Sequence, residues 1–185
     1  MRFNNHLNTD QELIERFLTT LGGGFAVLSS RKNAQPDFFI FAHDFIREYI
    51  EDDFFRKEEL FFNALEDSGF PGDVGPIGSM RSEQGKSHVN SDAMLSAAKY
   101  WQDTGEEARA DLVWSASEYT STLRQHLKQL NTLIFPLLEQ NLSDDEENKI
   151  VEEINNIVSE STSNGDADKL VRLVDMLENK LSGWQ

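Results

Sequence analysis

Residues 54–78 read FFRKEELFFNALEDSGFPGDVGPIG and join two helical segments across a reversal of the chain. The first part carries Phe54, Phe61 and Leu65 at the spacing that places side chains on one face of a helix. The second part, residues 68–77, contains three glycines and two prolines, which the interior of a helix does not tolerate. The stretch therefore predicts the end of a long helix, a turn and the start of the next helix.

Apolar residues at alternating steps of three and four predict four long helices around this corner. The first begins near Thr9, and its three consecutive glycines, residues 22–24, predict a kink or a break. The second covers about residues 37–67 and the third about residues 79–104. The fourth carries a regular stripe with a single polar member: Leu112, Ala116, Tyr119, Leu123, His126, Leu130, Leu133 and Leu137.

Two shorter helical segments follow residue 142. The first opens with the capping sequence SDDE at residues 143–146, and the turn SNG at residues 163–165 separates it from the second. We therefore expect an all-α fold with two parts. Residues 1–142 form an up-down-up-down four-helix bundle, and residues 143–185 form an αα-hairpin that packs on the bundle or on a partner subunit.

The composition is typical of an acidic, soluble protein. The chain has 185 residues, of which 38% are hydrophobic, and a net charge of −16. Such a surface repels nucleic acids and anionic membranes, so we expect neither as a partner. The sequence has no cysteine, which excludes disulfides and thiolate metal sites. It also lacks a signal-peptide pattern and an apolar run of the ~20 residues that span a membrane, so we expect a cytoplasmic protein.

Short motifs within the opening stretch resemble one known family. They are KEE at residues 57–59, LF at 60–61, ALE at 64–66, GFP at 69–71 and GPIG at 75–78. Together they are similar to the corner between the second and third helices of hemerythrin-like (HHE cation-binding) domains.

Two further blocks extend this resemblance to about residues 10–142. LRQHLKQLNTLIFP at residues 123–136 resembles the fourth helix of the family, and DQELIERFL at residues 10–18 weakly resembles the first. The resemblance implies a four-helix bundle in which histidines and bridging carboxylates hold two irons between the helices.

Most of the ligand positions that the resemblance implies hold other residues. In chain order they fall on Gln11, Phe54, Glu58, Gln84, His88, His126 and, for the last acid, Leu130 or Asn131. The iron that relies on the first two helices is therefore expected to be lost. On the third helix the inner stripe passes through Ser87 or His88, which the spacing alone does not separate.

The residues that remain, Glu58, His88 and His126, form a set of two imidazoles and one carboxylate. Such a set can hold one Fe, Zn or Mn ion with open positions, and Gln84 would be a weak oxygen ligand. A diatomic ligand such as O₂ or NO would bind only if the metal is present. Core histidines in bundles are also often simply hydrogen-bonded, and Glu58 could pair with His126. We expect the metal-free state in preference, and nothing in the spacing of His6 requires it to coordinate.

The sequence thus predicts a degenerate hemerythrin-like domain without a complete di-iron site. Its expected role is a non-catalytic interaction or regulatory module, with a protein partner or a homodimer through the C-terminal hairpin. The alternative is a single-metal protein that uses Glu58, His88 and His126 for small-ligand binding, redox sensing or iron handling. An enzyme with oxygen chemistry at this site is a weaker third hypothesis, because the sequence identifies no pocket for an organic substrate.

Overall fold

Helix is the only regular secondary structure in the part of the chain that the structure describes. The computed structural model describes residues 3–30, 34–104, 106–163 and 166–184, with the side chains of residues 3–6, 104, 106, 163, 166 and 167 outside that description. The elements are α1 (Phe3–Ser29), α2 (Pro36–Phe45), η1 (Ile46–Phe54), α3 (Phe55–Asp67), α4 (Gly75–Thr104), η2 (Glu106–Ala108), α5 (Arg109–Gln129), η3 (Leu130–Ile134), α6 (Phe135–Asn141), α7 (Asp144–Ser163) and α8 (Asp166–Ser182). None of these described helices is long and apolar enough to cross a membrane. The predicted all-α class is confirmed.

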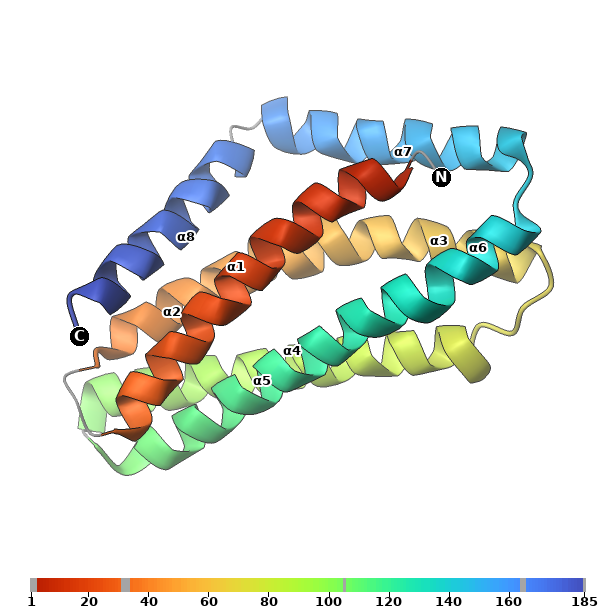
Figure 1. Cartoon of the computed structure of the whole chain (residues 1–185). Coiled ribbons are helices and arrows are strands. Elements are labelled where there is room, and N and C mark those ends of the chain that lie inside the picture. Colours follow the sequence, from red (N-terminus) through yellow and green to blue (C-terminus); the bar gives the residue numbers. More distant parts are fainter. Residues whose placement is uncertain (1–2, 31–33, 105, 164–165, 185) are drawn as a thin grey trace.

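The elements from α1 to α6 form four helical rods that make up the bundle, and Figure 1 shows how these rods lie beside one another. The first is α1, the second runs through α2, η1 and α3, the third is α4, and the fourth runs through α5, η3 and α6. Contacts join α1 to α5, α5 to α4 and α4 to α2, so the rods enclose one core. Aromatic side chains fill much of it, and the rings of Phe17 and Phe45 stack with their centroids 4.4 Å apart.

The corner between α3 and α4 depends on its glycines and on one arginine. Gly69 and Gly75 have φ angles of 96° and 64°, a region that favours glycine. Arg81 ties the two sides together, because it donates to Glu66 at 2.8 Å and to the carbonyl of Gly72 at 3.0 Å. Helix α4 begins at Gly75 rather than at the predicted residue 79. Pro76 fits the first turn of a helix, because backbone N–H groups in that turn have no hydrogen-bond acceptor within the helix and proline lacks this group.

The glycines at residues 22–24 predicted a kink or a break, and the break is wrong because α1 continues through them as one helix. Its glycines serve close packing instead. A Cβ atom added to Gly24 would lie 2.4 Å from the ring of Phe38, and one added to Gly23 would lie 2.4 Å from Leu181. These glycines therefore let α2 and α8 approach the backbone of α1.

Two π-helical segments interrupt the second and fourth rods. The segment η1 lies between α2 and α3, and η3 lies between α5 and α6. Pro136 follows η3 in the first turn of α6, where its lack of an N–H removes a hydrogen bond that a regular helix would make. A π turn shifts every later residue around the helix axis, so η1 and η3 change which side chains face the bundle interior.

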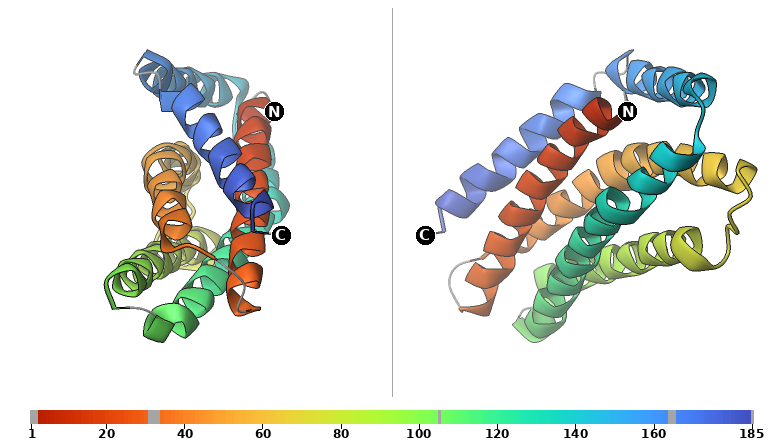
Figure 2. Two further views of the ribbon diagram at one scale, coloured as in Figure 1. Left: turned by 90° about the vertical axis from the view of Figure 1, so that its left-hand side faces the viewer. Right: turned by 45° about the vertical axis from the view of Figure 1, so that its right-hand side comes forward.

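The C-terminal helices α7 and α8, which we call the hairpin, lie on the outside of the bundle, and Figures 1 and 2 show that they meet at an open angle rather than side by side. Helix α8 contacts α1 and α2, and α7 contacts α3 and α1. The hairpin buries an apolar stripe within its own chain: Ile150, Ile154, Ile157, Leu170, Val174 and Leu177. Its position creates a second interior region, between the hairpin and the outer faces of α1 and α3.

Candidate metal centre

Glu58 on α3 and His126 on α5 meet inside the bundle. Both side chains are 0% exposed, and the Nε2 atom of His126 lies 2.7 Å from Oε2 and 2.9 Å from Oε1 of Glu58. Gln84 on α4 donates its amide to Oε2 of Glu58 at 2.8 Å. The Glu58 carboxylate thus accepts hydrogen bonds from side chains on two other helices.

A second carboxylate lies on the other side of the His126 ring. The Oε2 atom of Glu83 is 3.4 Å from Nδ1, and Gln129 donates to Oε1 of Glu83 at 2.7 Å. Burial by itself lowers the pKa of His126, but the charge and hydrogen bond of Glu58, with a contribution from Glu83, raise it to about 9. At neutral pH the imidazole is therefore protonated at both nitrogens, and neither offers a lone pair.

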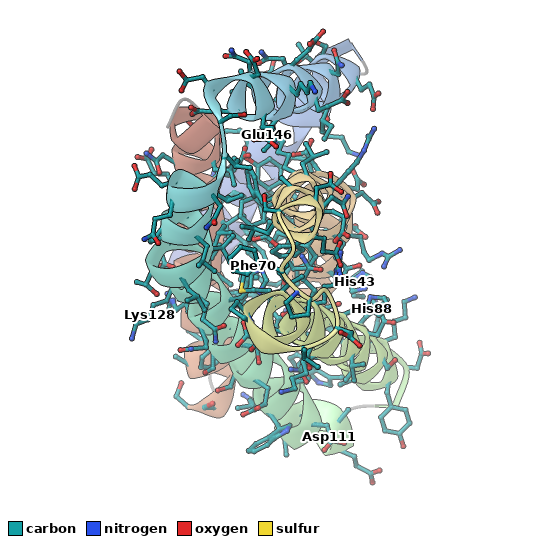
Figure 3. All side chains as sticks on the ribbon, turned by 90° about the vertical axis from the view of Figure 1, so that its right-hand side faces the viewer. His43, Phe70, His88, Asp111, Lys128 and Glu146 are labelled. Atoms are coloured by element: carbon teal, nitrogen blue, oxygen red, sulfur yellow. The ribbon has the colours of Figure 1, made fainter. Side chains whose placement is uncertain are left out.

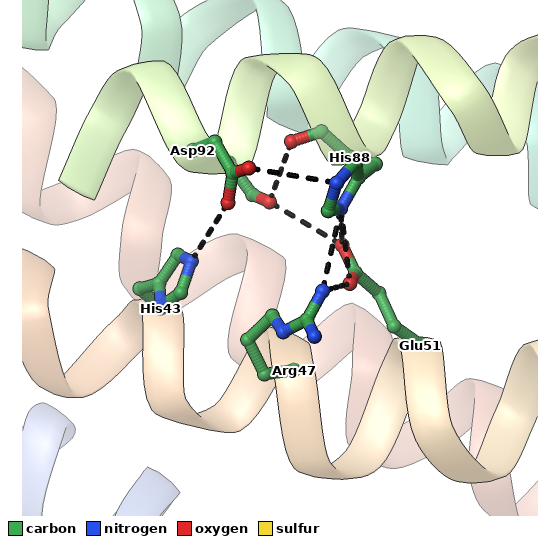
Figure 4. A network of polar contacts seen from close by, with 6 residues as sticks. His43, Arg47, Glu51, His88 and Asp92 are labelled. Carbon is green, nitrogen blue, oxygen red and sulfur yellow. Dashed lines mark hydrogen bonds and ion pairs between the residues drawn. The ribbon is translucent and has the colours of Figure 1, made fainter. Parts of the chain in front are cut away.

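The structure does not bring His88 to this point. Its side chain is 47% exposed, and its Nδ1 atom lies 3.2 Å from Glu51 while its Nε2 atom lies 3.5 Å from Asp92. Figure 3 shows His88 and His43 near each other at the edge of the bundle, and Figure 4 shows the network that they share with Arg47. Three of the sequence candidates, Glu58, Gln84 and His126, therefore lie together and the fourth lies apart.

The register of α4 explains the position of His88. Ser87 and Ser91, one turn apart, are 1% and 0% exposed and face the interior. Of the two neighbours that the sequence left unresolved, Ser87 is thus the inward residue. His88 is rotated by about 100° from Ser87, as each residue of an α-helix is from the next, which turns its ring toward Glu51.

Aromatic rings surround the remaining pair. Phe54, at the position where the resemblance implies a histidine, is fully buried. The ring of Phe55 lies edge-on to His126, with centroids 5.4 Å apart. The resemblance puts a His-His pair at residues 54 and 55, so both phenylalanines stand at positions where the family has imidazoles. Neither ring supplies a lone pair to a metal.

The first-helix and fourth-helix ligand positions hold two amides that bind each other. Gln11 donates to Asn131 at 3.2 Å, and Asn131 donates to Gln11 at 2.7 Å. Asn131 lies in the π turn η3, whereas Leu130 is fully buried in the core, so Asn131 is the residue that faces α1. The side chain of His6 lies outside the described residues.

These residues do not fit a di-iron centre. Among the described residues, no group of three or more histidine, aspartate and glutamate side chains is arranged to hold a metal ion. The side chains at the ligand positions are already engaged: buried Glu58 accepts from His126 and Gln84, and Gln11 and Asn131 bond to each other nearer the surface. What the arrangement does chemically is hold one buried imidazolium between two carboxylates.

Comparison with known proteins agrees with the fold and with the motifs. The family model of the hemerythrin HHE cation binding domain matches residues 6–138, which is more than half of the chain. No curated protein and no solved structure matches. The match includes all four rods of the bundle together with the corner at residues 68–77. The chain therefore belongs to the hemerythrin HHE cation-binding domain family.

Proposed function

We propose that this domain works without a di-iron centre, as a non-catalytic interaction or regulatory module. The observation that carries the proposal is the Glu58–His126 contact of 2.7 Å at the centre of the bundle. A direct contact between a bridging-carboxylate position and a histidine-ligand position leaves no room for an ion between them. The two side chains instead form an ion pair in the core, and most of their hydrogen bonds are made to other groups of the protein.

Charge balance supports the same proposal. A buried carboxylate without a counter-charge is costly, and in a metal site the cation supplies that charge. Here the protonated ring of His126 supplies it for Glu58, the fully buried carboxylate, while Glu83 on the other side of the ring is 13% exposed. The replaced positions likewise hold uncharged side chains, because Gln11 pairs with Asn131 and Phe54 is apolar.

Metal counting tests the proposal. The protein is purified without an affinity tag, incubated anaerobically with Fe(II), and separately with Zn²⁺ or Mn²⁺, and desalted before elemental analysis. We expect no metal above the background of a His126→Ala variant. Stoichiometric metal in the parent protein that disappears in His126→Ala would overturn the proposal.

A single-metal role is the second candidate, favoured by the meeting of Glu58, Gln84 and His126 at one buried point. In this alternative the imidazolium of His126 loses one proton, so that one ring nitrogen has a lone pair, and one ion joins the three side chains. The fourth sequence candidate, His88, would have to leave Glu51 and Asp92 to take part. A His88→Ala variant separates the two sets: if metal binds and His88→Ala retains it, His88 is not a ligand. Binding of O₂ or NO would be tested only on a metal-loaded sample.

A reverse experiment tests the register of the proposed ligand positions. Phe54 precedes Glu58 by four residues, which places both on one helix face. We expect the double variant Gln11→His/Phe54→His to bind more iron than the parent. The matched comparison is Gln11→His/Asn63→His, which puts the second histidine at an exposed position of α3 and should bind less iron than the first variant. Equal iron in both would mean that this register is wrong.

The interaction role draws support from exposed apolar side chains on α4 and α5. Trp114 is 68% exposed and Tyr100 is 49% exposed, whereas the hairpin buries its apolar stripe on its own bundle. Sedimentation velocity over a concentration series tests for a homodimer. Trp114→Glu should dissolve a dimer that uses the bundle face, and Val158→Glu one that uses the hairpin. If the protein is monomeric at every concentration, the homodimer hypothesis is wrong and the proposed partner is a different protein.

A further inference from the structure

A cavity of about 700 Å³ lies between the bundle and the C-terminal hairpin, away from the Glu58–His126 pair. Its lining residues come from the N-terminal half of α1, from η1 and the start of α3, and from the facing ends of α7 and α8. Figures 1 and 2 show α7 and α8 beside these segments. A volume of this size suits a small organic molecule.

The floor of the cavity holds a buried lysine between two buried aspartates. The Nζ atom of Lys57 lies 2.9 Å from Asp10 and 2.5 Å from Asp53. Lys57 is 3% exposed, and each aspartate is 8% exposed. Burial by itself lowers the pKa of Lys57, but the charges and hydrogen bonds of Asp10 and Asp53 raise it overall, so the amine stays protonated.

This floor therefore has one more negative charge than positive. The hydroxyl of Tyr49 donates to Asp10 at 2.7 Å, and that of Ser161 donates to Asp53 at 2.8 Å. Both partners are neutral and add no positive charge. The pKa of the Tyr49 hydroxyl is raised, first by burial and then by the charge of Asp10, which keeps the hydroxyl a donor.

The cations at the rim are already paired with carboxylates. Arg16 donates to Glu178 at 2.6 Å, and Arg56 donates to Glu160 at 2.7 Å. The lining as a whole contains six carboxylates, Asp10, Glu12, Glu48, Asp52, Asp53 and Glu160, and three cations, Arg16, Arg56 and Lys57. An anionic ligand would find no uncommitted positive group among these lining residues, whereas a cation would offset the excess of negative charge.

Part of the lining is apolar. Leu13, Val158, Leu170 and Val171 line the cavity, and Val158 and Val171 are partly exposed there. The ring of Tyr49 adds an aromatic face near the aspartates, which attracts organic ammonium groups. A ligand that matches these walls and the acidic floor has a short apolar body and a single positive charge.

We propose that the cavity under the hairpin binds a small organic amine in its ammonium form, with its head toward Asp10 and Asp53 and its apolar part against α7 and α8. A bare metal ion fits less well, because the apolar part of the lining offers it no oxygen ligands, whereas that part matches the carbon chain of an amine. The proposal does not depend on the metal-free reading of the bundle centre, since no lining residue belongs to that site.

Three probes with the same six-carbon body test the proposal by calorimetric titration of the full chain. They are hexylammonium, hexanol and hexanoate, which carry a positive, a neutral and a negative head. We expect one hexylammonium per chain, hexanol weaker by about tenfold or more, and no measurable hexanoate binding, because a charge-assisted hydrogen bond is the stronger kind. Absence of hexylammonium binding, or hexanol or hexanoate binding as tightly, would overturn the proposal.

Variants locate the binding. Asp53→Asn should weaken hexylammonium by about tenfold and leave hexanol within about twofold. If circular dichroism shows that Asp53→Asn does not fold, the exposed pair Glu12→Gln/Asp52→Asn replaces it, with the same selective loss for the ammonium. Val171→Trp should fill the cavity and weaken both probes, and Glu139→Gln, an exposed carboxylate on α6, is the matched control. Unchanged hexylammonium affinity in Val171→Trp would place the binding elsewhere and refute the inference.

Discussion

His126 gives the protein a titrating group in its core. Its pKa in the folded state is about 9, above the value of about 6.5 for an unfolded chain, because Glu58 outweighs burial. Protonation therefore favours the folded state. The stabilisation is complete below about pH 6.5 and is lost as the pH rises through about 9, and its upper limit is on the order of 3 kcal/mol.

Glu58→Gln should remove most of this dependence. Without the carboxylate the pKa of His126 falls, so the free energy of unfolding of the variant should change less than that of the parent between about pH 6 and pH 10. Urea unfolding at several pH values measures both curves, with Glu139→Gln as the control for loss of an exposed acid. Parallel curves for the parent and Glu58→Gln would show that His126 is not charged in the folded state.

We predict opposite changes in stability for alanine substitutions at two nearby glycines of α1. A Cβ at Gly22 would meet only Phe25, at 3.9 Å, whereas one at Gly24 would meet the buried ring of Phe38 at 2.4 Å. Gly22→Ala should stabilise the helix by about 0.5–1 kcal/mol through helix propensity. Gly24→Ala should destabilise the protein by about 1–3 kcal/mol through overpacking. Thermal unfolding of both variants checks the sign, and equal effects would mean that α2 does not pack closely on α1.

The hairpin should depend on apolar burial more than on its ion pairs. Leu177 on α8 is fully buried, so Leu177→Ala should cost about 2–5 kcal/mol. The Arg16 pairs with Asp175 and Glu178 join partly exposed side chains, so Arg16→Met should cost less than about 1 kcal/mol. Urea unfolding compares the two. A larger cost for Arg16→Met would make the ion pairs the dominant attachment.

Local sequence signals predicted the elements better than their register. The corner at residues 68–77 was predictable because glycine and proline act through their own backbone. The stripe through His126 holds from Leu112 to Leu130, but its next member, Leu133, lies in η3 and is 38% exposed. The π segments η1 and η3 leave no comparable pattern, since they arise from how packed helices accommodate an added residue. Whether His88 faces the interior depends on a shift of one residue in the helix register. The apolar stripe allowed either Ser87 or His88 as the inward residue, so the sequence could not decide between them.

Packing between distant elements was harder still to foresee. Lys57 belongs to the KEE motif, and its sequence gives no hint that Asp10 lies against it from α1. The cavity exists only because α7 and α8 lie at an angle that the sequence does not specify. The bundle centre was closer to the prediction, because Glu58 and His126 each lie on the inner face of a helix and their pairing was one of the alternatives that the sequence allowed. The fold can therefore be predicted from helical periodicity more reliably than a site whose residues come from separately packed helices.

Charge acts on the molecule as a whole. The chain carries 33 acidic and 17 basic side chains, so many carboxylates have no cation to pair with. Their mutual repulsion opposes the compact state, and salt screens it, because the Debye length falls from about 30 Å at 0.01 M to about 10 Å at 0.1 M. We expect NaCl over this range to raise the melting temperature by roughly 2–4 °C, which corresponds to about 1 kcal/mol for a chain of this size.

Two comparisons distinguish charge screening from specific cation binding as the cause of this rise in melting temperature. MgCl₂ at matched ionic strength should raise the melting temperature by about the same amount, because the described residues contain no group arranged to hold a metal ion. Screening acts at any exposed carboxylate, so Glu139→Gln and Asp52→Asn should each reduce the rise slightly and equally. A fall in melting temperature with NaCl would mean that the surface ion pairs outweigh the repulsion. A larger rise at sub-millimolar Mg²⁺ that His126→Ala abolishes would instead place a cation in the bundle.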